Sequence, residues 1–194
     1  MNDLNVWTKW VPIFPNDTRA KFDDKYVGFA KKDSNGFNMG GCYLYAYDET
    51  GEIMNDTPDH LDPRVKYIGT GGSSKARGIC SRTLDFSGTI MRGLSQKNPY
   101  ENGMYFRAMF GEEYKRHLYV AYFPMGYGDA VKLLAHAKES EMLKEYKSVY
   151  GSLPDLDGRQ GPEVMIKEYA KALTVQQMKE HIEWCTKQLN LGGY

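Results

Sequence analysis

"CYLYAYD", residues 42–48, alternates small or apolar side chains with tyrosines. Successive side chains of a β-strand point to opposite faces, so this alternation predicts a strand with its tyrosines on one face. The tyrosine face holds Tyr43, Tyr45 and Tyr47, and the other face holds Cys42, Leu44 and Ala46. A turn sequence, DETGE, follows, and VKYIG at 65–69 is typical of a second short strand. We therefore expect 42–48 and 65–69 to form an antiparallel pair, with the polar segment 53–64 as an excursion between them.

Capping residues and periodicity indicate the next elements. Ser73 or Ser74 can cap a helix that begins near Lys75. The strongest strand pattern in the chain is HLYVAYFP at 117–124, and Asp129 can cap a long helix that reaches about Tyr150. Glycines and a proline interrupt 86–103, which predicts short irregular pieces there. The order strand, strand, helix, strand, helix predicts the α+β class, as a small, mainly antiparallel three-stranded sheet flanked by helices.

Two segments extend this core. Residues 1–40 lack a regular pattern, but Trp7 and Trp10 indicate an apolar arm that packs on the core or on a partner. Residues 161–194 contain a capping-box start at Thr174, followed by apolar residues at helical spacing. We therefore expect an N-terminal arm over 1–40, one domain over 41–160, and a C-terminal helical extension over 161–194 that packs on the same domain.

Composition narrows the class of protein. The chain has 194 residues and equal numbers of basic and acidic side chains, 25 of each, which argues against a generally basic coat for nucleic acid. Residues 64–116 nevertheless hold ten Lys and Arg against four acids, a local excess that can face a polyanion or simply be solvated. Three widely spaced cysteines form neither a disulfide framework nor a zinc motif. With no signal peptide and no membrane-length apolar run, we expect a cytoplasmic protein without membrane contact.

The stretch VKYIGTGGSSKARGICSR, residues 65–82, combines a short strand, a loop of small residues and a basic helical start. Such loops can hold phosphate, because backbone N–H groups and a helix N-terminus attract anions. The P-loop pattern GxxxxGK[ST] is absent from this stretch, so the sequence does not predict a nucleotide-triphosphate cradle.

These residues resemble the GIY-YIG endonucleases. Gly41-Cys42-Tyr43 resembles the first triplet of that family, with Cys in place of Ile, and Tyr67-Ile68-Gly69 matches the second. Arg77 lies eight residues after Gly69, which is the spacing of the family arginine. The resemblance covers about 41–157, and Asp157 stands where the family often has asparagine.

The glutamate of the family has three candidates on the long helix, namely Glu139, Glu141 and Glu145. At about 100° per residue, Glu139 shares a helix face with the apolar residues Ala135, Met142, Leu143 and Tyr146, which should turn to the sheet. Glu141 falls on a solvent face. The sequence ESEMLK also resembles the family's Glu-x-x-Leu-Ile-Lys. We therefore select Glu139.

The resemblance implies a metal-dependent endonuclease that hydrolyses phosphodiester bonds in DNA. In that interpretation Tyr43, helped by Tyr67, activates the attacking water, Arg77 steadies the phosphate, and Glu139 holds Mg²⁺ or Mn²⁺. Four further residues are predicted to bind the substrate: Gly69, Lys75, Arg82 and His117.

Two alternatives remain open. The same scaffold could be a non-catalytic nucleic-acid-binding module, which would leave the late-helix carboxylate pointing away from the tyrosines. It could also be an interaction protein that works through the Trp7 and Trp10 arm and the C-terminal helix. The sequence does not indicate the cleavage site, the oligomeric state or the biological role.

Overall fold

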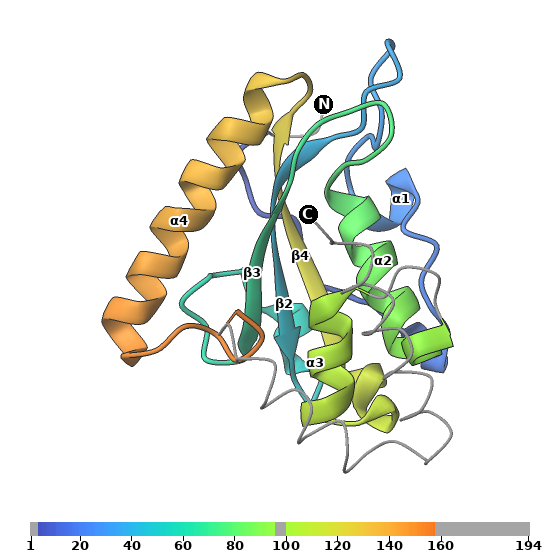
Figure 1. Cartoon of the computed structure of the whole chain (residues 1–194), viewed down its shortest axis with the longest axis vertical. Coiled ribbons are helices and arrows are strands. Elements are labelled where there is room, and N and C mark those ends of the chain that lie inside the picture. The colour runs from blue at the N-terminus through green and yellow to red at the C-terminus, as the bar shows by residue number, and fades with distance from the viewer. Residues whose placement is uncertain (1–3, 96–99, 158–194) are drawn as a thin grey trace, which may run out of the picture.

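The computed structural model describes residues 4–95 and 100–157 (Figure 1). A single antiparallel sheet has the strand order β1-β4-β2-β3. Its strands are β1 (Val11–Pro12), β2 (Gly40–Tyr47), β3 (Val65–Gly71) and β4 (Leu118–Gly126). The α-helices are α1 (Asp24–Val27), α2 (Ile79–Arg92), α3 (Glu101–Met109) and α4 (Ala130–Tyr150). The 3-10 turns are η1 (Pro15–Asp17), η2 (Glu52–Asn55), η3 (Gly93–Ser95) and η4 (Glu112–His117). The α+β class is confirmed.

The predicted pairing of the first two strands is also confirmed. β2 and β3 run antiparallel, with Tyr43 opposite Gly69 and Tyr45 opposite Tyr67. β4 pairs with the other side of β2, and Tyr122 lies opposite Tyr43. β2 is therefore the central strand, and it is almost completely buried.

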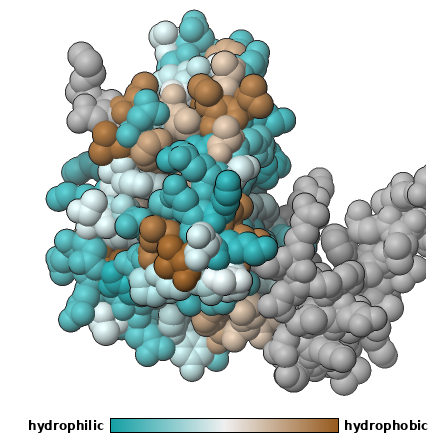
Figure 2. All heavy atoms as spheres, turned by 90° about the vertical axis from the view of Figure 1, so that its left-hand side faces the viewer, coloured by the Kyte–Doolittle hydropathy of each residue, from teal (hydrophilic) through white to brown (hydrophobic). Residues whose placement is uncertain are grey.

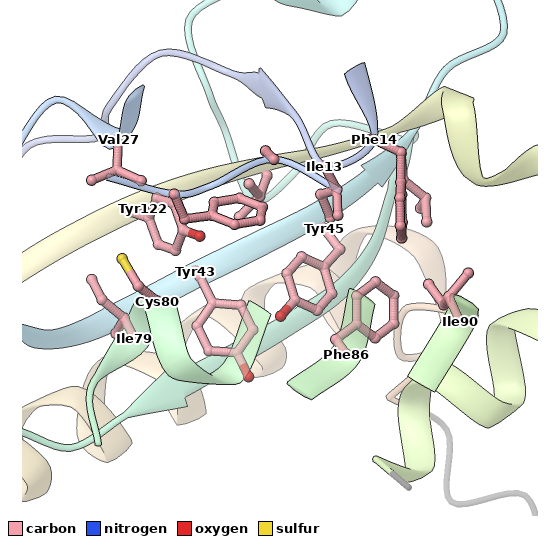
Figure 3. Packing of buried hydrophobic residues seen from close by; sticks show 14 of the residues in the cluster. Ile13, Phe14, Val27, Tyr43, Tyr45, Ile79, Cys80, Phe86, Ile90 and Tyr122 are labelled. Carbon is pink, nitrogen blue, oxygen red and sulfur yellow. The ribbon is translucent and has the colours of Figure 1, made fainter. Parts of the chain in front are cut away.

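The two faces of β2 belong to two separate clusters, as the alternation predicts. Tyr43 and Tyr45 lie in a cluster with residues of α2 and α3 (Figure 3). The ring of Tyr45 stacks on Phe86 of α2 with 4.2 Å between ring centroids. Cys42 and Leu44 lie in the other cluster, with residues of α4. Figure 1 shows the resulting layers, with α4 on one side of the sheet and α2 and α3 on the other.

The expected number of strands was wrong by one, because the N-terminal arm supplies β1. Val11 pairs with Val120 of β4, and the backbone N–H of Thr8 donates to the carbonyl of Tyr122 at 2.8 Å. Trp10 is buried, and Trp7 lies on Phe123 with 5.1 Å between ring centroids. The arm therefore packs on the sheet of its own chain. The predicted extension over 161–194 lies outside the described residues.

The helix after β3 begins later than its capping serines indicated. Ser74 makes a turn with Arg77 in place of a cap, and α2 begins at Ile79. A Cβ on Gly71 would lie 2.8 Å from the backbone of Ile79, so the close contact of α2 with the sheet requires glycine there.

The segment 86–103 is more regular than its glycines and proline indicated. α2 continues to Arg92, and α3 begins at Glu101. A Cβ on Gly103 would lie 2.8 Å from the carbonyl oxygen of Phe86, so this glycine allows α3 to approach α2 closely. The glycine that suggested a break serves helix packing instead.

The long helix follows its prediction, from Ala130 to Tyr150, although the side chain of Asp129 makes no capping hydrogen bond. Ala135, Met142 and Tyr146 are buried, as the helical spacing indicated. The thiol of Cys42 donates to the carbonyl of Ala135 at 3.4 Å, which ties α4 to the central strand. The outer side of α4 is mostly hydrophilic, with small hydrophobic patches (Figure 2). Within the described ranges, no helix has the length and apolarity that crossing a membrane requires.

Thr83 of α2 anchors the tyrosine face of the sheet. Its buried hydroxyl accepts hydrogen bonds from the phenols of Tyr45, at 3.3 Å, and of Tyr122, at 2.9 Å. One threonine therefore satisfies hydroxyls from the two neighbouring strands β2 and β4, where an unpaired polar group would be costly.

Replacing Thr83 tests this anchor. Thr83→Val keeps the shape and removes the acceptor, and we expect the free energy of unfolding to fall by about 1–3 kcal/mol. Thr83→Ser keeps the hydroxyl and should lose about 0.8 kcal/mol for the missing methyl group. Urea denaturation of the two variants measures the difference. An equal loss in both would mean that volume, and not the hydroxyl, stabilises this layer.

Candidate active site

Tyr43 and Tyr67 come together because the residue opposite Tyr43 is glycine. A Cβ on Gly69 would lie 2.5 Å from the ring of Tyr67 and 2.8 Å from the hydroxyl of Tyr43. Both phenol rings therefore occupy the space above Gly69, with 5.8 Å between their centroids. Tyr43 has no exposed surface, whereas Tyr67 is half-buried and lines a pocket. The structure thus brings together three of the predicted residues, Tyr43, Tyr67 and Gly69.

A third phenol, Tyr100, completes this group. Its hydroxyl lies 3.3 Å from that of Tyr43. A hydrogen bond with Tyr100 also contributes to the raised pKa of Tyr67, although burial is the larger cause. Sequence reasoning missed Tyr100, since it lies 57 residues from Tyr43 in a segment expected to be irregular. Pro99, immediately before it, was the nearby signal in the sequence, and a proline indicates a turn rather than a site.

Glu139 of α4 lies near the outer edge of β3. Its side chain is 21% exposed, and its carboxylate lies 3.2 Å from Nδ1 of His136. The same nitrogen is 3.4 Å from the hydroxyl of Thr70 on β3. Burial raises the pKa of Glu139, while His136 and Arg82 act in the opposite direction. His136 was not predicted, although its position three residues before Glu139 allows contact on one helix face.

The other two glutamates point elsewhere. Glu141 is fully exposed and pairs with Lys138 at 2.9 Å. Glu145 contacts His60 of the 53–64 segment at 2.7 Å. The helix-face argument for Glu139 therefore agrees with the packing of α4.

Asp157 reaches the same edge from the loop after α4. The backbone N–H of Leu156 donates to the carbonyl of Lys66 at 2.8 Å, and Asp157 accepts from the N–H of Ile68 at 2.7 Å. The loop thus pairs with β3 in the manner of a short added strand. Burial, with a contribution from the charge of Glu139, raises the pKa of Asp157 to about 8.

Charge effects connect these residues into one group. Asp157 and Glu139 both raise the pKa of Tyr67, and Arg82 of α2 lowers that of Glu139. Each of these four side chains is therefore close enough to at least one of the others for its charge to change that group's pKa. A phenol, two carboxyl groups and a guanidinium whose charges act on one another can bind and polarise a phosphate ester.

The other predicted residues lie outside this group. Arg77 is 61% exposed and pairs with Asp85 at 3.4 Å. Lys75 lies over the ring of Phe37, with 5.7 Å from its nitrogen to the ring centroid. His117 precedes β4 beside Tyr47, which is four residues, or about 13 Å along the strand, from Tyr43. Arg82, which the sequence predicts as a substrate-binding residue and as the fallback for the role of Arg77, is the predicted basic residue whose charge acts on Glu139.

The local excess of positive charge is largely neutralised by ion pairs. Arg64 contacts Asp48, Asp56 and Asp62, and Lys66 contacts Asp155. Arg107 and Lys115 share Glu112. Within 64–95 and 100–116, the basic residues without an ion pair are Lys75, Arg82, Arg92 and Arg116. The excess therefore does not form a continuous basic face.

Burial fixes the protonation of the phenols. It raises the pKa of Tyr43 well above its usual value, and neighbouring phenols add to the effect. Burial likewise raises the pKa of Tyr67, so both hydroxyls stay protonated near neutral pH. Protonated phenols donate hydrogen bonds, and the predicted action of Tyr43 as a proton acceptor does not suit this environment.

The carboxyl groups suit a hard divalent cation. Glu139 and Asp157 offer oxygen ligands, which Mg²⁺ and Mn²⁺ prefer. Burial is the main cause of the raised pKa of Asp157, the charge of Glu139 adds to it, and a cation between the two groups would relieve that repulsion. Within the described part of the chain, no cluster of three or more His, Cys, Asp or Glu side chains could hold a metal by itself. Water and phosphate oxygens would have to complete the coordination.

Comparison with known proteins finds no match among models of protein families, curated proteins or solved structures. The assignment of a function to this group of residues therefore depends on its geometry and on the resemblance of its motifs.

Gly69→Ala tests whether the absence of a side chain holds the two phenols in place. The new methyl group would displace Tyr43 and Tyr67, so we expect the free energy of unfolding to fall by about 1–3 kcal/mol. Near-ultraviolet circular dichroism should change as well, because the environment of the tyrosines changes. In Gly72→Ala the nearest atoms are methylenes of the Lys132 side chain at 3.1 Å, so this control should remain close to wild type. Similar losses in both variants would contradict the role given to Gly69.

Asp157 should make stability depend on pH. Its folded pKa of about 8 lies above the unfolded value near 4. The folded protein therefore holds the extra proton, and stability decreases as pH rises from about 4 to about 8. Asp157→Asn removes the titrating group. The melting temperature of the variant relative to that of wild type should therefore rise from pH 5 to pH 8, and the difference should stay constant above pH 8. Melting curves that are parallel throughout would show that Asp157 titrates normally.

Proposed function

We propose that the protein is a metal-dependent DNA endonuclease of the GIY-YIG type, hydrolysing phosphodiester bonds at the outer edge of β3. The observation that carries the proposal is the electrostatic coupling of Tyr67, Glu139 and Asp157, which come from three separate elements.

The order of elements adds support. β2 carries the first triplet and pairs with β3, which carries the second. α2 follows β3 and brings Arg82, and α4 follows β4 and brings Glu139. The resemblance implies this succession of tyrosine, tyrosine, arginine and glutamate, although its spacing selects Arg77, which precedes α2, in place of Arg82.

Each residue then has a role that fits its environment. Tyr67, whose phenol stays protonated, donates to a phosphate oxygen or to the attacking water. Tyr43 packs beside its ring, and Tyr100 lies within hydrogen-bond distance of Tyr43. Arg82 stabilises the negative charge that builds on the phosphate. Glu139 would hold Mg²⁺ or Mn²⁺, which when bound offsets charge on the leaving 3′ oxygen.

Asp157 is the residue best suited to accept the proton of the water. A pKa of about 8 makes it more basic than an ordinary carboxylate while leaving a usable ionised fraction near neutral pH. The water oxygen bonds to phosphorus as the bond to the 3′ oxygen breaks. Its proton passes to Asp157, and the leaving oxygen takes a proton from solvent.

A non-catalytic nucleic-acid-binding module is the second candidate. The complete burial of Tyr43 favours it, because a catalytic phenol would need to reach the substrate. In that case DNA would bind at the same edge without being cleaved.

Incubation with supercoiled plasmid tests the proposal. We expect wild type to nick the plasmid with Mg²⁺ or Mn²⁺ and to leave it intact with EDTA. Glu139→Ala should abolish nicking, and Arg82→Ala should slow it about 100-fold or more. Gel electrophoresis over time gives the rates.

Two variants serve as matched controls. Glu141→Ala changes an exposed glutamate on the same helix, and Arg77→Ala changes the exposed arginine that the motif spacing selects. Both should nick at close to the wild-type rate. A loss in Arg77→Ala but not in Arg82→Ala would return the arginine role to Arg77. Binding of DNA by wild type without nicking under any metal condition would favour the second candidate.

A further inference from the structure

A pocket of about 460 Å³ opens beside Tyr67, between the start of α3 and the loop after α4. Its lining includes Tyr67, Tyr100, Glu101, Asn102, Tyr105 and Asp157. The volume falls within the range of about 300–1,000 Å³ that is typical of small-molecule sites. The proposed hydrolysis uses only its wall at Tyr67 and Asp157, so most of the pocket has no role in that chemistry.

The lining combines aromatic rings with polar groups at one end. Three tyrosines line the pocket, and bases stack on aromatic side chains regardless of sequence. Asn102 is half-buried at the start of α3 and presents an amide, which can both donate and accept. Glu101 accepts from the hydroxyl of Tyr105 at 3.2 Å, which holds its carboxylate at the pocket.

We propose that this pocket receives one nucleobase, unstacked from the nucleic acid whose phosphate lies at Tyr67. The inference rests on the proposed function only for the position of that phosphate. Tyr67 belongs both to the pocket and to the group at the β3 edge, so a nucleotide bound there would have its base and its phosphate near the same phenol.

The charges in the pocket favour a neutral base over an anion. The carboxylate of Glu101 repels phosphate and accepts hydrogen bonds, and the amide oxygen of Asn102 is a second acceptor. Cytosine, adenine and guanine present amino groups with two N–H donors each, whereas an unpaired thymine presents only its single ring N–H to these acceptors. We therefore expect the pocket to prefer an unpaired cytosine to an unpaired thymine.

The substrate implied is a nucleic acid with an unpaired nucleotide. Turning a base out of a paired duplex costs a few kcal/mol, and the cost is smallest where the base has no partner. A bulge, a mismatch or a single-stranded segment would present its base to the pocket most readily.

Binding of three labelled DNA duplexes to the full chain tests the inference. The duplexes are identical except that one is fully paired, one has a single bulged cytosine and one has a single bulged thymine. Fluorescence anisotropy in EDTA measures affinity without cleavage. We expect the cytosine bulge to bind wild type about tenfold more tightly than the paired duplex, with the thymine bulge between them.

Asn102→Ala should bring the affinity for the cytosine bulge close to that for the paired duplex. Asn35→Ala, an exposed asparagine in a distant turn, should keep the preference. Equal binding of the three duplexes by wild type would overturn the inference, and so would an unchanged preference in Asn102→Ala.

The outcome is separable from that of the plasmid assay. A preference for the bulge without plasmid nicking would support the base pocket and reject the nuclease. Nicking without any preference would support the nuclease and reject the pocket.

Discussion

One pairing underlies the candidate site: Tyr43 on the central strand lies opposite Gly69, a residue with no side chain. At any other residue in that position a Cβ would collide with both phenols. Because the ring of Tyr43 can lie over Gly69, it meets Tyr67 from the neighbouring strand and Tyr100 from the segment before α3. The register of a two-stranded pair therefore determines where three phenols meet.

The candidate site also depends on the outer edge of the sheet, which later parts of the chain cover. β3 is the last strand of the sheet, so its outward N–H and carbonyl groups need partners. The loop after α4 provides them at Lys66 and Ile68, and this pairing brings Asp157 alongside Tyr67. α4 reaches the same edge through Glu139, and the bond from Cys42 to Ala135 fixes the position of that helix. The polar residues thus gather as a result of ordinary backbone pairing and helix packing.

Much of this arrangement follows from local sequence patterns. The period of two in 42–48 predicts both faces of β2, and the helical spacing around Glu139 separates it from Glu141. These signals are strong because one face of each element is buried. The position of Arg82 could not be obtained in this way, since it depends on α2 beginning at Ile79, which in turn depends on the bare backbone at Gly71. Tyr100 and β1 depend on contacts over large sequence separations, and no local pattern encodes them, whereas the helical spacing of His136 and Glu139 could have indicated their contact. The raised pKa of Asp157 arises from burial that only the folded chain creates.

The N-terminal arm has a consequence for the solution behaviour of the molecule. From Asn5 to Ile13 it donates hydrogen bonds to β4 and so occupies the flank of the sheet opposite β3. Exposed strand flanks recruit strands from other molecules, and this is a common start of aggregation. With the arm on one flank and the 156–157 loop on the other, the sheet offers few sites for such growth. The arm therefore covers an edge through which the sheet could otherwise self-associate. Without it, β4 would be an exposed edge strand.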